Sequence, residues 1–145
     1  MEIIKITPET GQHETYTNDR IADFLFEHLD QFGDKREAIM QCLNYVFNDS
    51  HGGFVVLGIE DGEIMGAVII NKTGMEGYIP ENILVYIAVS AKMRGKGLGK
   101  ELMNATIEEA NGSIALHVEP DNPAKFLYEK LGFTNKYLEM RLIKE

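Results

Sequence analysis

The stretch ILVYIAVSAKMRGKGLGKELMNATIEEA, residues 83–110, contains a strand pattern, a glycine-rich turn and a helix pattern in direct succession. The apolar run Ile83–Val89 has the length and composition of a buried strand, and Lys100–Ala110 has the apolar spacing of a helix. Between the two, three glycines alternate with Lys96 and Leu98. This succession predicts an α/β domain that carries a special turn between a strand and a helix.

The turn has the properties of an anion-binding site. The first N–H groups of a helix have no partner within the helix, and their partial positive charge attracts phosphate. Glycines permit positive φ and let a ligand approach the backbone. We therefore interpret residues 94–100, called the glycine turn below, as a diphosphate-binding site rather than a simple chain reversal. Its members are Arg94, Gly95, Lys96, Gly97, Leu98, Gly99 and Lys100.

The spacing excludes two common nucleotide motifs. A P-loop needs Ser or Thr after its lysine, whereas Lys100 precedes Glu101. The dinucleotide fingerprint is G-x-G-x-x-G, whereas this turn has G-x-G-x-G. A third pattern, Arg/Gln-x-x-G-x-Gly/Ala, is matched by Arg94, Gly97 and Gly99. This match resembles the acyl-CoA-binding motif of GNAT-type N-acetyltransferases.

A second segment, DNPAKFLYEKLGF at residues 121–133, resembles the other CoA-contacting segment of that family. The residues alone predict a short helix here. Asn122 is a suitable cap, and Gly132 is suited to ending the helix. We expect Phe126 and Leu127 to pack inward.

The resemblance implies one N-acetyltransferase domain over residues 1–145. The expected fold class is α/β, with a mixed, mostly antiparallel sheet flanked by helices, as in the GNAT acyl-CoA N-acyltransferase-like fold. The implied reaction is direct transfer of an acetyl group from acetyl-CoA to a primary amine of a small molecule or peptide. The resemblance also implies that Tyr128 protonates the leaving thiolate. The further cofactor contacts that it implies are backbone groups of Ile87, Ala88 and Val89 and the side chain of Asn122.

The general base is not assigned by the resemblance. Many relatives have a glutamate in the strand before the turn, whereas Ile83 and Val85 stand at those positions here. Histidine is suited to proton transfer near neutral pH, and His117 shares one face of the next expected strand with Glu119. Glu81 lies at the mouth of the earlier strand. We favour His117 or Glu81, acting through water.

The remaining elements follow from periodicity and turn signals. Asn18 is the expected cap of the first helix, and Asp61–Gly62 predicts a hairpin turn. By resemblance, the acceptor is selected by residues 18–47 and 72–81, where Met75, Tyr78 and Glu81 suit an amphipathic amine. The expected strands are residues 2–6, 52–60, 64–71, 82–89, 113–119 and 133–143, and the expected helices are residues 18–32, 35–47, 100–110 and 122–132.

Composition limits the class of partner. The net charge of −9 disfavours nucleic acid and favours cationic partners. The single cysteine, Cys42, excludes an internal disulfide, and no apolar run is long enough to span a membrane. We therefore expect a cytoplasmic protein without a metal site. The closing hairpin of the family is abbreviated here, so we also expect that the final strand can pair with a second subunit in a homodimer.

Two other interpretations remain open. The missing strand glutamate is compatible with a non-catalytic acyl-CoA-binding sensor or regulatory module. A nucleotide-binding domain of another kind would be stabilised by ATP or NAD instead of coenzyme A.

Overall fold

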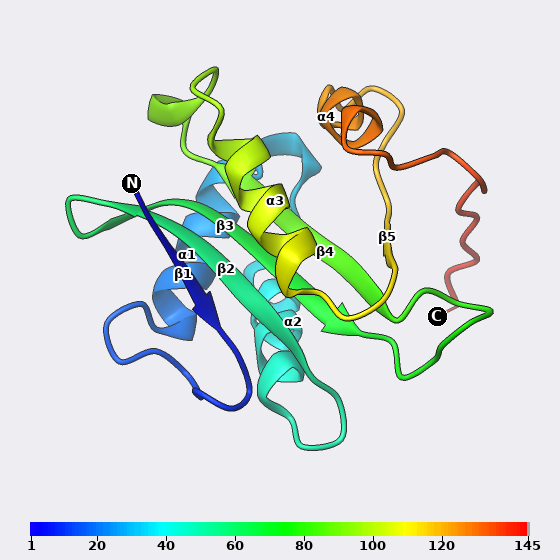
Figure 1. Cartoon of the computed structure of the whole chain (residues 1–145), viewed down its shortest axis with the longest axis horizontal. Coiled ribbons are helices and arrows are strands. Elements are labelled where there is room, and N and C mark those ends of the chain that lie inside the picture. The colour runs from blue at the N-terminus through cyan, green and yellow to red at the C-terminus, as the bar shows by residue number, and fades with distance from the viewer. Residues whose placement is uncertain (145) are drawn as a thin grey trace.

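A computed structural model describes residues 1–144, which form a five-stranded sheet with the strand order β1-β2-β3-β4-β5 (Figure 1). The first four strands pair antiparallel, and β5 pairs parallel to β4. The expected α/β fold with a mixed, mostly antiparallel sheet is therefore confirmed. The strands are β1 (Glu2–Ile6), β2 (Gly53–Glu60), β3 (Glu63–Lys72), β4 (Asn82–Val89) and β5 (Ile114–Leu116).

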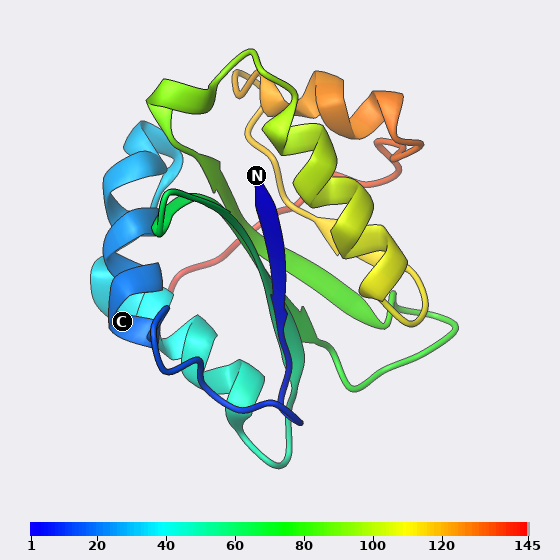
Figure 2. The same cartoon turned by 60° about the vertical axis from the view of Figure 1, so that its left-hand side comes forward.

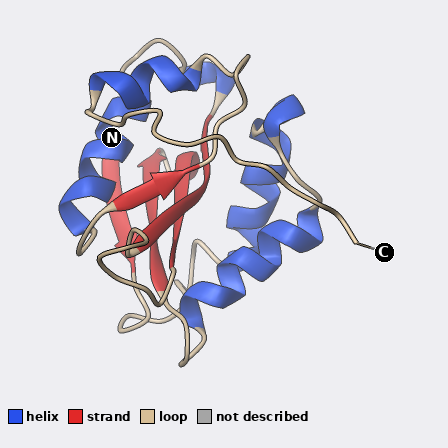
Figure 3. Cartoon of the chain, turned by 90° about the vertical axis from the view of Figure 1, so that its right-hand side faces the viewer, coloured by secondary structure: helices blue, strands red, loops and turns tan. Residues whose placement is uncertain are grey.

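Helices cover both faces of the sheet, as Figures 2 and 3 show. One layer consists of α1 (Asn18–His28), the 3-10 helix η1 (Asp30–Phe32) and α2 (Arg36–Phe47); the other consists of α3 (Leu98–Glu109) and α4 (Ala124–Lys130). A short 3-10 helix, η2 (Ala91–Met93), follows β4. Each layer encloses its own apolar core against the sheet. Among the described residues, no helix has the length and apolar character required to cross a membrane.

A pair of glycines positions α3 on the sheet. Gly58 of β2 lies directly opposite Gly66 of β3. A Cβ atom on Gly66 would lie 2.6 Å from Leu102 Cδ1, and one on Gly58 would lie 3.0 Å from Leu98 Cδ1. The absence of side chains at this pair lets the first turns of α3 pack directly on the backbone of the sheet. The glycine turn, which precedes α3, is therefore held by the core.

The sheet separates between β4 and β5. Their pairing runs only from Asn82 opposite Ile114 to Leu84 opposite Leu116. A register shift follows in β4, because Leu84 pairs with Ile70 while Tyr86 pairs with Ile69, which leaves the residue between them as a bulge. Beyond the bulge, no strand of the described chain pairs with the outer edge of β4.

Two of the expected strands differ from the structure. The strand expected at residues 113–119 is restricted to Ile114–Leu116. The strand expected at residues 133–143 is absent, because no neighbouring strand supplies hydrogen bonds to that segment. Its large apolar side chains, including Leu138 and Leu142, are instead exposed.

Two local expectations were also wrong. The cap of α1 is Thr17, whose hydroxyl accepts a hydrogen bond from the Arg20 amide, and Asn18 is the first helical residue. Phe126 is 59% exposed rather than packed inward. The short helix α4 turns Leu127 and Tyr128 toward the core instead.

Candidate active site

The glycine turn leaves open space beside its backbone. Gly97 precedes the first residue of α3 with a φ of 82°, and Gly95 has a φ of 79°. L-residues with side chains rarely adopt such angles. A Cβ atom at either glycine would meet nothing within 4 Å. A ligand could therefore approach the main chain at both positions.

The backbone amides at the start of α3 are available to an anion. The first intrahelical bond of α3 runs from the Glu101 amide to the Gly97 carbonyl, at 3.1 Å. No carbonyl within residues 1–144 accepts a backbone hydrogen bond from the amides of Leu98, Gly99 or Lys100. The positive end of the helix dipole acts at the same place. Free amides beside open backbone are suited to an anion, and the sequence predicts that this anion is a diphosphate group.

Arg94 points away from these amides. Its Nη2 lies 3.3 Å from the His28 carbonyl oxygen and 3.2 Å from Asp30 Oδ2, and its Nε donates to the Val89 carbonyl at 3.3 Å. Lys96 and Lys100 are exposed and appear in none of the ion pairs of the described residues. In this structure Arg94 connects the glycine turn to the end of α1, and the two lysines supply the free positive charge.

Of the three β4 backbone positions that the resemblance implied, two face the open edge. The Ser90 amide donates to the Met65 carbonyl of β3 at 2.8 Å. Because backbone groups alternate along a strand, those of Ala88 also face β3, whereas those of Ile87 and Val89 face outward. The bond from Arg94 to the Val89 carbonyl agrees with this orientation.

The second predicted segment forms α4 and buries Tyr128. Asn122 Oδ1 accepts a hydrogen bond from the Ala124 amide at 2.9 Å at the start of α4, although Pro123 and not Asn122 occupies the cap position. Gly132 follows the helix with a φ of 103°, as expected for its end. Tyr128 is only 6% exposed, and its ring centre lies 5.9 Å from that of Phe133. Burial raises the pKa of Tyr128 to about 12, so its phenol is protonated at neutral pH.

The candidate bases have different surroundings. His117 follows β5 directly and is exposed. Glu81 Oε1 accepts a hydrogen bond from the Ser113 amide at 2.7 Å, and its Oε2 accepts one from the Gly77 amide at 3.1 Å. These backbone hydrogen bonds lower the pKa of Glu81. Glu81 thus connects the β3–β4 loop to the segment before β5. Its lowered pKa makes it a weaker proton acceptor than an ordinary glutamate.

A polar pair that the sequence did not reveal lies on the other face of β4. The Tyr86 hydroxyl donates to Asp34 Oδ2 at 2.9 Å, and Asp34 Oδ1 accepts from the Lys35 amide at 3.1 Å. Burial and the nearby carboxylate raise the pKa of Tyr86. Tyr86 belongs to an apolar strand pattern, and its partner is 52 residues away in sequence, so no local spacing signals the pair.

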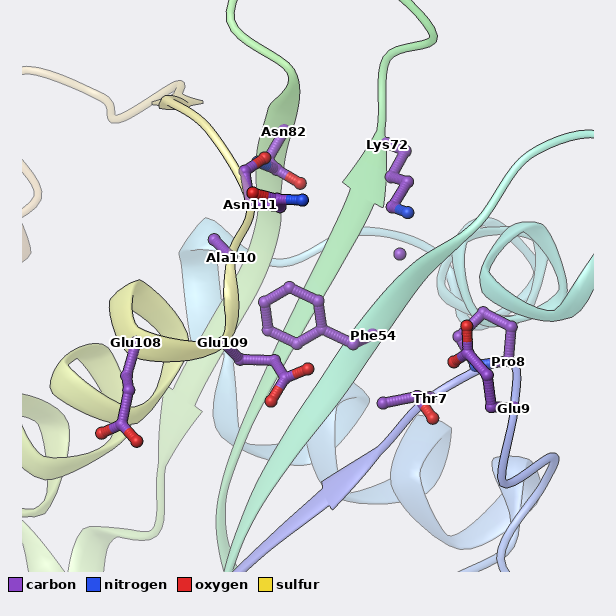
Figure 4. A pocket seen from close by; sticks show the side chains of 11 residues that line it. Thr7, Pro8, Glu9, Phe54, Lys72, Asn82, Glu108, Glu109, Ala110 and Asn111 are labelled. Atoms are coloured by element: carbon purple, nitrogen blue, oxygen red, sulfur yellow. The ribbon is translucent and has the colours of Figure 1, made fainter.

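A separate hollow lies at the opposite end of β4, near the C-terminus of α3 (Figure 4). It has a volume of about 350 Å³, and its lining includes Glu9, Phe54, Lys72, Asn82 and Glu109. None of the predicted catalytic or cofactor-binding residues lines it, although Lys72 begins the segment that is predicted to select the acceptor. The hollow is therefore separate from the predicted cofactor site.

Comparison with known proteins defines the class. Residues 13–133 match the model of the acetyltransferase (GNAT) family, which covers most of the chain. The chain belongs to this family.

The match to an individual relative covers a shorter part of the chain than the family model does. The chain is 31% identical over 84 residues to a 5-NmdU N-acetyltransferase of Pseudomonas phage PaMx11. That match spans 57% of this chain and 58% of the phage protein.

Solved structures show the same fold. An aminoglycoside N-acetyltransferase in complex with CoA is 17% identical, with a TM-score of 0.70 over 99% of this chain and 93% of that one. A transcriptional regulator from Bacillus halodurans C-125 is 15% identical, with a TM-score of 0.70 over 99% of this chain and 100% of that one. A ribosomal-protein-alanine N-acetyltransferase from Brucella melitensis biovar Abortus 2308 is 16% identical, with a TM-score of 0.66 over 99% and 100%.

Proposed function

We propose that this chain is a single-domain N-acetyltransferase that transfers the acetyl group of acetyl-CoA directly to a primary amine of a small molecule or peptide. The observation that carries the proposal is the row of free amides at the start of α3, beside the open backbone of Gly95 and Gly97. Membership of an acetyltransferase family supports acetyl transfer. The acyl donor and the amine are the proposed details.

The proposed cofactor site lies along the open edge of β4. The amides of Leu98, Gly99 and Lys100 would hold the diphosphate, with Lys96 and Lys100 adding positive charge. The outward backbone groups of Ile87 and the amide of Val89 would hold the pantetheine arm, since the Val89 carbonyl already accepts a hydrogen bond from Arg94. The side chain of Asn122, at the start of α4, is the remaining proposed contact. Acetyl-CoA would supply the thioester that the amine attacks.

Two side chains are proposed to handle protons. Tyr128 donates a proton to the departing sulfur, because its raised pKa keeps the phenol protonated at neutral pH. The amine must lose a proton before it attacks, since a free amine of this type has a pKa near 10. His117 receives this proton through water, and Glu81 is the alternative that its hydrogen bonds make less favourable.

The test is release of free thiol when the purified protein is mixed with acetyl-CoA and a panel of amines. We expect thiol release that depends on both the protein and an amine. Calorimetry with CoA, ATP and NAD measures the cofactor preference separately.

Binding of CoA without release of thiol from acetyl-CoA in the presence of any amine would favour the sensor, which the apolar residues Ile83 and Val85 would suit. Stabilisation by ATP or NAD but not by CoA would favour another nucleotide-binding function. A ligand at 100 times its dissociation constant adds about 2.7 kcal/mol to the free energy of unfolding, so a melting assay resolves these cases.

A further inference from the structure

The hydrogen-bonded pair of Asp34 and Tyr86 lies beside the place where the sheet separates. Tyr86 is the residue of β4 directly after the bulge, where pairing with β5 has already ended. Its ring packs against the core beneath α1 and α2, whereas Tyr128 belongs to the core beneath α3 and α4. The two tyrosines therefore lie on opposite faces of the sheet.

Asp34 is a fixed carboxylate without a cation. Its neighbours in this layer are paired: Asp19 and Asp23 bind Arg36, and Asp30 binds Arg94. No ion pair of Asp34 is present within residues 1–144, although the residue is exposed. Its oxygens are held by the Tyr86 hydroxyl and the Lys35 amide. An oriented anion of this kind can receive a cation from outside the chain.

The segment that carries Asp34 is fixed at two points. Arg94 binds the His28 carbonyl and the Asp30 carboxylate, which ties the end of α1 to the glycine turn. The hydrogen bond from Tyr86 ties Asp34 itself to β4. The position of the carboxylate is therefore set relative to the strand that would hold the pantetheine arm.

We propose that Asp34 binds an ammonium group of the acceptor and that Tyr86 is the positioning residue for that carboxylate. This inference rests on the proposed function and narrows its substrate to amines that carry a second positive charge, such as linear diamines. The reacting nitrogen must be neutral, whereas a carboxylate attracts a charged nitrogen. Both conditions are met together when the acceptor has two amino groups.

The acceptor would approach from the α1 and α2 face. Its charged end would lie on Asp34 and its neutral end at the open edge of β4. The net charge of −9 favours the approach of a dication to this protein. No proton transfer is assigned to Asp34, so the role is recognition and not base catalysis.

The test compares linear α,ω-diamines with monoamines of the same chain length. Thiol release is measured with the unaltered protein and with Asp34→Asn, Tyr86→Phe and the control Asp49→Asn. Asp49 is an exposed aspartate at the other end of α2, so the control makes the same change of charge away from the open edge. Binding of 1,4-diaminobutane to the CoA-bound protein is measured in parallel by calorimetry.

We expect the unaltered protein to prefer diamines. Asp34→Asn should lower kcat/KM for diamines about tenfold, through KM, and leave monoamines and CoA affinity nearly unchanged. Tyr86→Phe should raise KM for diamines about threefold. Asp49→Asn should change none of these values.

The outcomes separate this inference from the proposed function. If thiol release occurs but Asp34→Asn affects diamines and monoamines equally or not at all, the inference is overturned and the function stands. If no amine leads to thiol release from acetyl-CoA but 1,4-diaminobutane binds and Asp34→Asn abolishes the binding, the proposed cation site is supported and the proposed enzymatic function is overturned. If neither release nor binding of the diamine occurs, both are overturned.

Discussion

Gly97 is the residue at which the backbone geometry and the proposed chemistry meet most directly. The Gly97→Glu variant would place a carboxylate in the open space beside the free amides of α3. We expect CoA binding to be abolished, because a like charge replaces the diphosphate, and calorimetry measures the loss. The positive φ of 82° should cost about 1 kcal/mol of stability. Gly62→Glu is the control, since Gly62 has a φ of 76° and equally open surroundings at the hairpin turn. Equal CoA affinity in both variants would refute the assignment of the site.

Tyr128 allows a test of the chemical step. Tyr128→Phe removes the hydroxyl but keeps the buried ring. We expect turnover to fall about 10- to 100-fold while the affinity for CoA changes little, because a thiolate can also leave without a proton donor. Steady-state kinetics of thiol release measures the split, with Tyr137→Phe as the control on an exposed tyrosine. Full activity of Tyr128→Phe at every pH would remove Tyr128 from the mechanism.

Cys42 makes the fold sensitive to alkali. Burial raises the pKa of its thiol from 9.0 to about 12. The folded protein therefore keeps the neutral thiol, which the unfolded chain loses above pH 9. The stabilisation is fully present below pH 9 and is lost as pH rises toward 12, by about 1.4 kcal/mol per pH unit.

The measurement is urea unfolding at pH 9 and pH 10, where the thiol of the unfolded chain ionises while that of the folded protein stays neutral. Cys42→Ala should show a smaller loss of stability over this interval than the unaltered protein. The other titratable groups are the same in Cys42→Ala and in the unaltered protein, so their contributions cancel when the two are compared. Parallel pH dependence in the two proteins would show that the thiol does not govern this loss.

At the scale of an element, the close packing of α3 on Gly58 and Gly66 of the sheet determines the position of the glycine turn. Gly66→Val would force a side chain against Leu102, which lies 2.6 Å from the position of the added Cβ. We expect a loss of about 1–3 kcal/mol of stability from overpacking. CoA affinity should also fall, because α3 carries the free amides. Calorimetry and urea unfolding measure the two effects.

The double variant Gly66→Val with Leu102→Ala is the control for this contact. Removing the Leu102 side chain frees space for the valine, so the double variant should recover CoA affinity relative to Gly66→Val alone. If the two changes are simply additive, the contact between them does not position α3.

The sequence predicted those elements whose signals are local. The hairpin at Asp61–Gly62, the first helix and the helix around Tyr128 all follow from turn residues and apolar spacing, and the structure contains each of them. The prediction that the strand continues through residues 117–119 was wrong. A strand forms only where a neighbouring strand pairs with it, and the local sequence of a segment does not reveal whether such a partner is present.

In the candidate site, too, the sequence predicted features formed by neighbouring residues and missed contacts between distant ones. The glycine turn could be found because its residues are contiguous, and in the structure it has open backbone and free amides. The direction of the Arg94 side chain could not be found, since His28 and Asp30 come from a segment far away in sequence. The pairing of Tyr86 with Asp34 was missed for the same reason.

At the scale of the whole molecule, residues 137–143 expose a row of large apolar side chains. The exposed residues are Tyr137, Leu138, Met140, Leu142 and Ile143. Exposed apolar surface of this kind favours association, and its alternation suits a strand. We expect a homodimer in solution, measured by light scattering.

Replacing Leu138, Met140 and Leu142 together with serine should give a monomer that still binds CoA. The unaltered protein at micromolar concentration provides the comparison. A monomeric mass for the unaltered protein would show that this segment does not mediate self-association.

The short pairing of β5 has a consequence for how the molecule opens. β5 and α4 join the four-stranded body through three ladder pairs and the side-chain packing of one core. Backbone that has few ladder partners exchanges its amide hydrogens through low-energy local opening. We therefore expect the arm that carries Tyr128 to open at a lower free energy than β2 and β3, which hydrogen exchange measures. In the proposed reaction, such opening would release the spent coenzyme without global unfolding.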